Sequence, residues 1–177
     1  TDTPVLIDDS STNTVSSEIF VPESQSEYLI EDINVTVNIS HTSISDLIIT
    51  LTSPEGTTIT LLDRVCAGLE DMDVIFDDKG FSQACNSSAP ALSGLTIPED
   101  KLSAFYGESF NGSWLLTVED VTFQNGGAID TFGIEFCREE TLSTSNGEMS
   151  EFSILPNPSS GRVAIKYGLP TLNESKI

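Results

Sequence analysis

The chain has 177 residues, of which 28 are acidic and only 7 are basic, so its formal net charge is -21 at pH 7. The electrostatic field of this negative charge repels phosphate backbones and anionic membrane surfaces, which excludes nucleic-acid binding. It favours divalent cations as ligands. No apolar run approaches the roughly 20 residues of a membrane helix, so membrane insertion is not expected. The length fits one domain plus a shorter additional segment, or one large β domain.

A polar segment opens the chain at residues 1–17, and its short apolar patch Val5–Ile7 predicts a linker with one edge strand. Residues 18–137 have the apolar content of a compact domain. Residues 138–150 are rich in charge, Ser, Thr and Asn-Gly, which predicts a second linker. Residues 151–177 begin a new strand-like pattern. The absence of an initial Met and of a signal peptide leads us to expect a piece of a larger precursor.

Within the compact domain, apolar residues alternate with polar ones rather than following a helical period. Turn signals separate these runs, among them Ser53–Gly56, Asn111–Gly112 and Asn125–Gly127. Short alternating runs with such punctuation predict an all-β fold, an antiparallel β-sandwich. The predicted strands cover residues 33–40, 47–51, 58–62, 114–118 and 129–136.

The residues that usually carry catalysis are scarce. His41 is the only histidine, and the motifs of zinc peptidases, α/β-hydrolases, P-loops and dinucleotide-binding folds are absent. A Ser-His-Asp triad would have to use His41, and a nucleophile pair would have to join it to Cys137. Because His41 ends an alternating strand, we expect a structural role instead, in which it hydrogen-bonds the turn that leads to Asp46.

Three cysteines allow three disulfide pairings, and the sequence alone cannot choose among them. Cys66 and Cys85 flank an acidic loop, and we favour a bridge between them, with Cys137 left over. A bridge of that span stabilises by about 3 kcal/mol in the chain-entropy model. The alternative is three free thiols in a reducing compartment.

A series of motifs in a fixed order marks the compact domain. It begins with His41–Leu47 and Leu51–Thr57, and continues with an F-x-D segment at Phe76–Asp78. It then includes Phe105-Tyr106-Gly107-Glu108, Asn111-Gly112-Ser113-Trp114, Leu116–Asp120 and Gly127–Phe132. This series resembles the P domain, or Homo B domain, which follows the catalytic domain in proprotein convertases and in many bacterial secreted proteases.

The resemblance implies a jelly-roll sandwich without catalytic residues, which supports the folding and stability of an adjoining protease domain. His41, Pro54, Gly56 and Trp114 then have structural roles, Trp114 in the core. The parent would be a subtilisin-like serine or a zinc metallopeptidase, and its catalytic domain would be the partner. We expect a secreted or cell-surface monomer. The alternative is an adhesion or carbohydrate-binding module, because β-sandwiches serve both roles.

Residues 152–170 resemble the start of a type IX secretion sorting domain. Leu155-Pro156-Asn157-Pro158 and the apolar run Val163–Ile165 match its beginning, whereas its later strands are missing. This resemblance implies the type IX secretion machinery as a second partner. The alternative is an ordinary Pro-rich linker.

Calcium is the expected cofactor, because it takes six to eight oxygen ligands from carboxylates, carbonyls and water. Five carboxylates fall at or near predicted strand ends within the motifs, and some bacterial relatives of this family are similar in using calcium there. These residues are Asp46, Asp77, Asp78, Glu108 and Asp120. We expect them to converge at one end of the sandwich, with Asp71 and Asp73 as a weaker second site. The alternative is that all of them are solvated turn caps.

Overall fold

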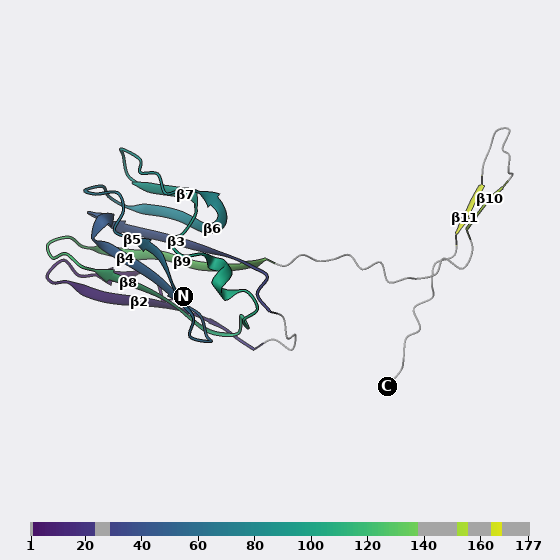
Figure 1. Cartoon of the computed structure of the whole chain (residues 1–177), viewed down its shortest axis with the longest axis horizontal. Helices are drawn as coiled ribbons and strands as arrows, with labels where there is room; N and C mark the ends of the chain where they lie inside the picture. The colour runs from purple at the N-terminus through teal and green to yellow at the C-terminus, as the bar shows by residue number, and fades with distance from the viewer. Residues whose placement is uncertain (1, 24–28, 138–151, 156–163, 168–177) are drawn as a thin grey trace. The chain divides into compact units, whose positions relative to one another are not determined.

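The structure, a computed structural model, describes residues 2–23, 29–137, 152–155 and 164–167 (Figure 1). The chain divides into two units, Thr1–Glu139 and Glu140–Ile177. In the described part of the second unit, β10 (Phe152–Leu155) pairs antiparallel with β11 (Ala164–Tyr167). No helix of the described residues is long and apolar enough to cross a membrane.

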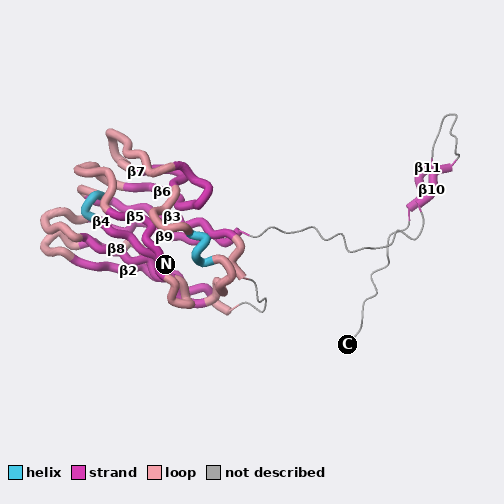
Figure 2. The backbone as a smooth tube through the Cα atoms, in the orientation of Figure 1, coloured by secondary structure: helices cyan, strands magenta, loops and turns pink. Residues whose placement is uncertain are grey.

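Two β-sheets face each other in the first unit, and they confirm the predicted β-sandwich (Figures 1 and 2). The five-stranded sheet has the order β1-β9-β3-β6-β7, and the four-stranded sheet has the order β2-β8-β4-β5. Two short 3-10 helices, η1 (Ile44–Asp46) and η2 (Leu102–Phe105), accompany them.

The strands of the five-stranded sheet are β1 (Val5–Ile7), β9 (Gly127–Cys137), β3 (Asp32–His41), β6 (Met72–Phe81) and β7 (Leu92–Thr96). Its neighbours pair antiparallel, except that β7 runs parallel to β6. The four-stranded sheet is antiparallel throughout. Its strands are β2 (Asn13–Val21), β8 (Gly112–Asp120), β4 (Leu47–Thr52) and β5 (Thr58–Asp63).

The core lies between the inner faces of the two sheets. Successive side chains of a strand point to opposite faces, so Val35 and Val37 on β3 are fully buried while the intervening Thr36 is only half-buried. Each fully buried aliphatic side chain of this kind contributes about 1.5–3 kcal/mol. Trp114 of β8 is fully buried and contacts Phe105 edge-on, with ring centroids 5.1 Å apart.

Three strands go beyond the predicted set. β2 begins at Asn13, so the segment expected to be a linker contributes most of a nine-residue strand as well as β1. β6 occupies much of the region expected to be an acidic loop between Cys66 and Cys85, and β7 follows that region. The sheets therefore extend on both sides beyond the strands that alternation alone revealed.

Candidate functional site

Two opposite ends of the sandwich carry the polar side chains of interest. At the first, which we call the His41 end, β3 finishes at His41, β8 finishes at Asp120 and β9 begins at Gly127. At the second, which we call the Asp32 end, β3 begins at Asp32 and β8 begins at Gly112. The direction of the strands fixes which residues share an end.

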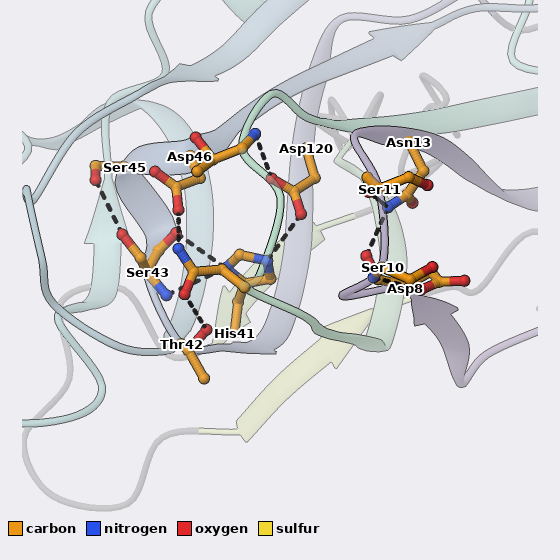
Figure 3. A network of polar contacts seen from close by, with 12 residues as sticks. Asp8, Ser10, Ser11, Asn13, His41, Thr42, Ser43, Ser45, Asp46 and Asp120 are labelled. Carbon is orange, nitrogen blue, oxygen red and sulfur yellow. Dashed lines mark hydrogen bonds and ion pairs between the residues drawn. The ribbon is translucent and has the colours of Figure 1, made fainter.

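His41 and Asp120 form a buried pair at the His41 end (Figure 3). His41 Nε2 lies 3.5 Å from Asp120 Oδ2, and both side chains are fully shielded from solvent. Neither atom has a hydrogen-bond partner among the described residues, so each depends on the other. His41 Nδ1 lies 2.9 Å from the Ser43 carbonyl oxygen and 3.2 Å from the Ser43 amide nitrogen. The ring therefore ties the turn after β3 to the end of β8.

Asn125 links the same turn to the loop between β8 and β9. Its Nδ2 donates to Asp46 Oδ2 at 2.6 Å, and its Oδ1 accepts from the Thr42 hydroxyl at 3.1 Å. A backbone hydrogen bond connects the same turn to the end of β8, since Val121 N–H donates to the Asp46 carbonyl at 2.9 Å. Figure 3 shows Thr42 and Asp46 beside the buried His41. Two segments distant in sequence, residues 41–46 and 120–125, thus meet at one end of the sandwich.

Asp71, predicted as part of a weaker cation site, also lies at this end. Its Oδ1 accepts the backbone N–H of His41 at 2.9 Å. Asp73 is exposed on β6 and faces away from the core. One carboxylate of this predicted pair therefore already has a structural partner in the backbone of β3.

At the Asp32 end, Asp78 caps η2. Its two carboxylate oxygens accept the backbone N–H groups of Leu102 at 2.8 Å and Ser103 at 3.0 Å. Orphan N–H groups at the start of a helical turn are usually satisfied in this way. Among the described residues, the neighbouring Asp77 carboxylate accepts the N–H of Lys79, at 2.7 Å, and no N–H of η2.

A second carboxylate of the Asp32 end, Glu108, lies between η2 and β8. Its Oε1 accepts from the Thr57 hydroxyl, and its backbone carbonyl accepts Ile30 N–H at 2.9 Å. Its Oε2 is buried without a hydrogen-bond partner among the described residues. Glu108 therefore holds the turn between β4 and β5 against the loop that precedes β8.

The five predicted calcium ligands do not converge. Asp46 and Asp120 lie at the His41 end, whereas Asp77, Asp78 and Glu108 lie at the Asp32 end, because β8 separates Glu108 from Asp120 along its whole length. The described residues contain no group of three or more His, Cys, Asp or Glu side chains placed to hold a metal ion. These five carboxylates therefore do not fit a single calcium site.

The sequence did not reveal a surface cluster at the Asp32 end. Asp32 accepts from Lys79 Nζ at 2.9 Å and from the Tyr106 hydroxyl at 3.0 Å. The hydrogen bond from Lys79 holds the pKa of Asp32 below its ordinary value. Burial, and then the hydrogen bond to Asp32, raise the pKa of Tyr106 to about 12. No local motif signals this cluster, because its members come from three separate segments.

The predicted structural residues occupy packing and turn positions. Ser53 N–H donates to the Thr57 carbonyl at 2.8 Å, and Gly56 N–H donates to the Ser53 carbonyl at 3.0 Å, which closes the turn that contains Pro54. Gly56 has φ 94°, a left-handed conformation that favours glycine. The Trp114 indole N–H donates to the Phe110 carbonyl at 3.0 Å.

Cys66 and Cys85 form a disulfide with a Cα–Cα distance of 5.4 Å, the pairing favoured from the sequence. Cys66 follows β5 of one sheet, and Cys85 lies between β6 and β7 of the other. The bridge therefore joins the loop that crosses between the sheets to the connection that leads into the parallel edge strand β7.

In this β-sandwich the residues of the sequence motifs take part in packing, turns and caps. The family model described as the proprotein convertase P-domain matches residues 30–136. That match covers more than half of the chain, so the chain belongs to the proprotein convertase P-domain family. P domains are non-catalytic accessory domains of proteases.

Two solved structures match part of the chain. One is the serine protease of Aeromonas sobria in complex with its chaperone, with 20% identity over 73% of this chain and a TM-score of 0.43. The other is the serine protease of Aeromonas sobria, with 19% identity over 73% of this chain and a TM-score of 0.41. The match spans 24% of each of those chains. Comparison with curated proteins gives no match.

Proposed function

We propose that this chain is the accessory module of a secreted multidomain endopeptidase, where it supports the folding and stability of an adjoining catalytic domain. The observation that carries the proposal is the family match over residues 30–136, which includes every strand from β3 to β8 and nearly all of β9. The peptidase would be of the subtilisin-like serine type or a zinc metallopeptidase. The catalytic domain of the same precursor would be the partner.

The chemistry of the described residues agrees with a module that performs no catalysis of its own. His41 is the only histidine of the chain, and its side chain is fully buried against Asp120. A general base must reach the proton that it abstracts from a bound substrate. His41 instead holds a turn and the end of a strand, so we expect no peptidase activity from the isolated chain.

A comparison of the full precursor with and without residues 30–136 tests the proposal. We expect the shortened precursor to give less folded protease and to lose activity faster on heating. Equal yield and equal inactivation rates would contradict the accessory role. Peptidase activity of the isolated chain that disappears in His41→Ala would also contradict it and would favour an independent enzyme.

We also propose that residues 151–177 belong to a sorting region for type IX secretion, which would place the module outside the cell. The support is the Leu155–Pro158 motif and the apolar run Val163–Ile165, which lie largely outside the described residues. Replacing Pro156-Asn157-Pro158 by alanines in the precursor should retain it inside a type IX-competent cell. Unchanged export would contradict this assignment.

Calcium remains a proposal that rests on charge rather than on a preformed site. The chain carries a net charge of -21, and calcium binds carboxylate oxygens. Because the described residues hold no cluster of three ligands, we expect a small rise in melting temperature with calcium relative to EDTA. A sodium chloride control at equal ionic strength separates binding from screening. Identical melting curves in calcium and EDTA would contradict the proposal.

The second candidate function is an adhesion or carbohydrate-binding module of a surface protein. Its support is the sandwich fold, which serves both roles. Catalytic motifs in the precursor sequence upstream of Thr1 would favour the peptidase, whereas repeated β modules there would favour adhesion.

A further inference from the structure

We propose that Asn125 is a site of spontaneous deamidation, and that this modification releases the loop between β8 and β9 from the His41 end. The inference does not depend on the role of the module in a protease. It rests on the Asn125–Gly126 sequence, on the two contacts of the Asn125 side chain and on the carboxylate that one of them engages.

The dipeptide itself supplies the reactivity. An asparagine side chain is attacked most readily by the following backbone nitrogen when that residue is glycine, because no Cβ obstructs the approach. Packing requires glycine at this position, since a Cβ on Gly126 would lie 2.8 Å from Asp9 Cβ and 3.0 Å from the Ile7 carbonyl oxygen. The fold therefore retains the reactive pair.

The covalent step is balanced with water as the only co-reactant. The Gly126 backbone nitrogen loses its proton and forms a bond to Asn125 Cγ, and the bond from Cγ to Nδ2 breaks with release of ammonia. Water then opens the cyclic imide at either carbonyl. The products are aspartate, or isoaspartate with an extra methylene in the backbone. Either product carries one more negative charge than asparagine.

That charge falls beside an existing carboxylate, Asp46. Asn125 Nδ2 donates to Asp46 Oδ2 at 2.6 Å, so deamidation replaces a hydrogen-bond donor by a second carboxylate. Ionised carboxylates only accept hydrogen bonds, and two of them in contact repel each other. Two further carboxylates, Asp71 and Asp120, lie at the same end.

The loop has few ways to adapt while it stays attached. Gly126 accepts the Thr42 N–H at 3.3 Å through its carbonyl oxygen, and Gln124 N–H donates to the Asp9 carbonyl at 2.9 Å. The next residue, Gly127, packs so closely that a Cβ there would lie 1.8 Å from the Ser40 carbonyl oxygen. Repulsion from Asp46 is therefore relieved by detachment of residues 121–126 rather than by a small shift.

A second Asn-Gly pair provides an internal control. Asn111 precedes Gly112, which is the first residue of β8 and pairs with Val21 of β2. Gly126 instead precedes β9 and lies in the loop. The β2–β8 ladder holds Gly112, whereas Gly126 is held by packing and by the 3.3 Å hydrogen bond from Thr42 N–H rather than by a strand ladder, so we expect Asn125 to react faster.

The first experiment follows the modification in the full chain. The protein is incubated under mildly alkaline conditions and digested, and mass spectrometry measures the exchange of an amide for a carboxylate at Asn111 and Asn125. We expect the product to accumulate faster at Asn125. An unmodified Asn125 under conditions that deamidate a short peptide of the same local sequence would overturn the modification site.

The second experiment isolates the consequence by thermal unfolding of three variants. Asn125→Asp can still accept the Thr42 hydroxyl, but it replaces the donor to Asp46 by a repelling carboxylate and should lower the melting temperature. Asn125→Ala loses both hydrogen bonds without adding a charge, so it measures the part of the loss that does not come from repulsion. The double variant Asn125→Asp with Asp46→Asn reverses donor and acceptor and should recover most of the loss, which also keeps the test informative if Asn125→Asp alone fails to fold. A melting temperature of Asn125→Asp equal to that of wild type, or no recovery in the double variant, would overturn the proposed release.

Discussion

The two ends of the sandwich stabilise the fold by different means. At the His41 end, a fully buried pair of His41 and Asp120 lies among contacts from three segments, residues 41–46, Asp71 and residues 120–125. At the Asp32 end, Asp32 interacts with Lys79, whose side chain is 75% exposed. Buried pairs depend on each partner because a lone buried charge is costly, whereas exposed pairs are screened by water.

This difference predicts that equivalent substitutions have unequal effects at the two ends. Contacts at the His41 end join β3, β8 and the loop before β9, so their loss affects both sheets. At the Asp32 end, the contacts of Asp32 and Asp78 hold η2 and the surface near it, while Glu108 joins the turn between β4 and β5 to the loop before β8. The exposed Asp32–Lys79 pair should therefore contribute less to stability than the buried His41–Asp120 pair.

The largest effect should come from the buried pair. His41→Ala removes a fully buried ring and leaves Asp120 Oδ2 buried without a neighbouring donor, which together cost about 3–5 kcal/mol of unfolding free energy. Lys79→Ala is the matched control, because it removes the exposed partner of Asp32, and it should barely change the unfolding free energy. Chemical denaturation measures the unfolding free energy of both variants. Similar losses in the two variants would contradict the contrast between the ends.

The next effect concerns the disulfide, which closes a loop with a sequence separation of 19 residues. Cys66→Ala with Cys85→Ala should lower the unfolding free energy by about 3 kcal/mol in the chain-entropy model. A reducing agent should bring wild type close to the double variant and leave the double variant unchanged. If the reductant destabilised both proteins equally, this bridge would not be the stabilising one.

A smaller loss is expected at the cap of η2. Asp78→Ala removes the acceptor of two backbone N–H groups, and caps of this kind contribute about 0.5–2 kcal/mol. Asp77→Ala is the neighbouring control, since among the described residues that carboxylate accepts the local Lys79 N–H and no N–H of η2. Urea unfolding should show the loss for Asp78 alone. An equal loss of unfolding free energy for Asp77→Ala would mean that any negative charge here, rather than the cap of η2, stabilises this end.

Much of the fold could be predicted because apolar and polar residues alternate along a strand wherever one of its faces is buried and the other is exposed. The missed strands had weaker patterns. In β6, Met72, Val74 and Phe76 are buried, but aspartates surround them, so the run was interpreted as an acidic loop. In β7, Gly94 interrupts the pattern, and β2 is a largely polar edge strand.

The polar site was harder to predict because strand direction decides which residues meet. The bond of His41 to the following turn could be predicted, since Ser43 is only two residues away. Its pairing with Asp120 depends on how β8 runs beside β4, which local sequence does not reveal. The same limitation explains why five carboxylates in family motifs were expected to converge although they lie at opposite ends.

The smallest effect should appear only in alkali, at Tyr106. Burial and the hydrogen bond to Asp32 raise its pKa from 10.0 to about 12 in the folded module. The folded state therefore binds this proton more tightly than the unfolded state, so the contribution is fully present below pH 10 and is lost as the pH rises through about 12. Tyrosinate absorbance should show one late titration that Tyr106→Phe removes. Replacing Asp32 by Asn should move that titration to lower pH, because it removes the neighbouring negative charge. A late titration that persists in Tyr106→Phe would assign it to another tyrosine and would leave the Asp32 end without this pH-dependent contribution.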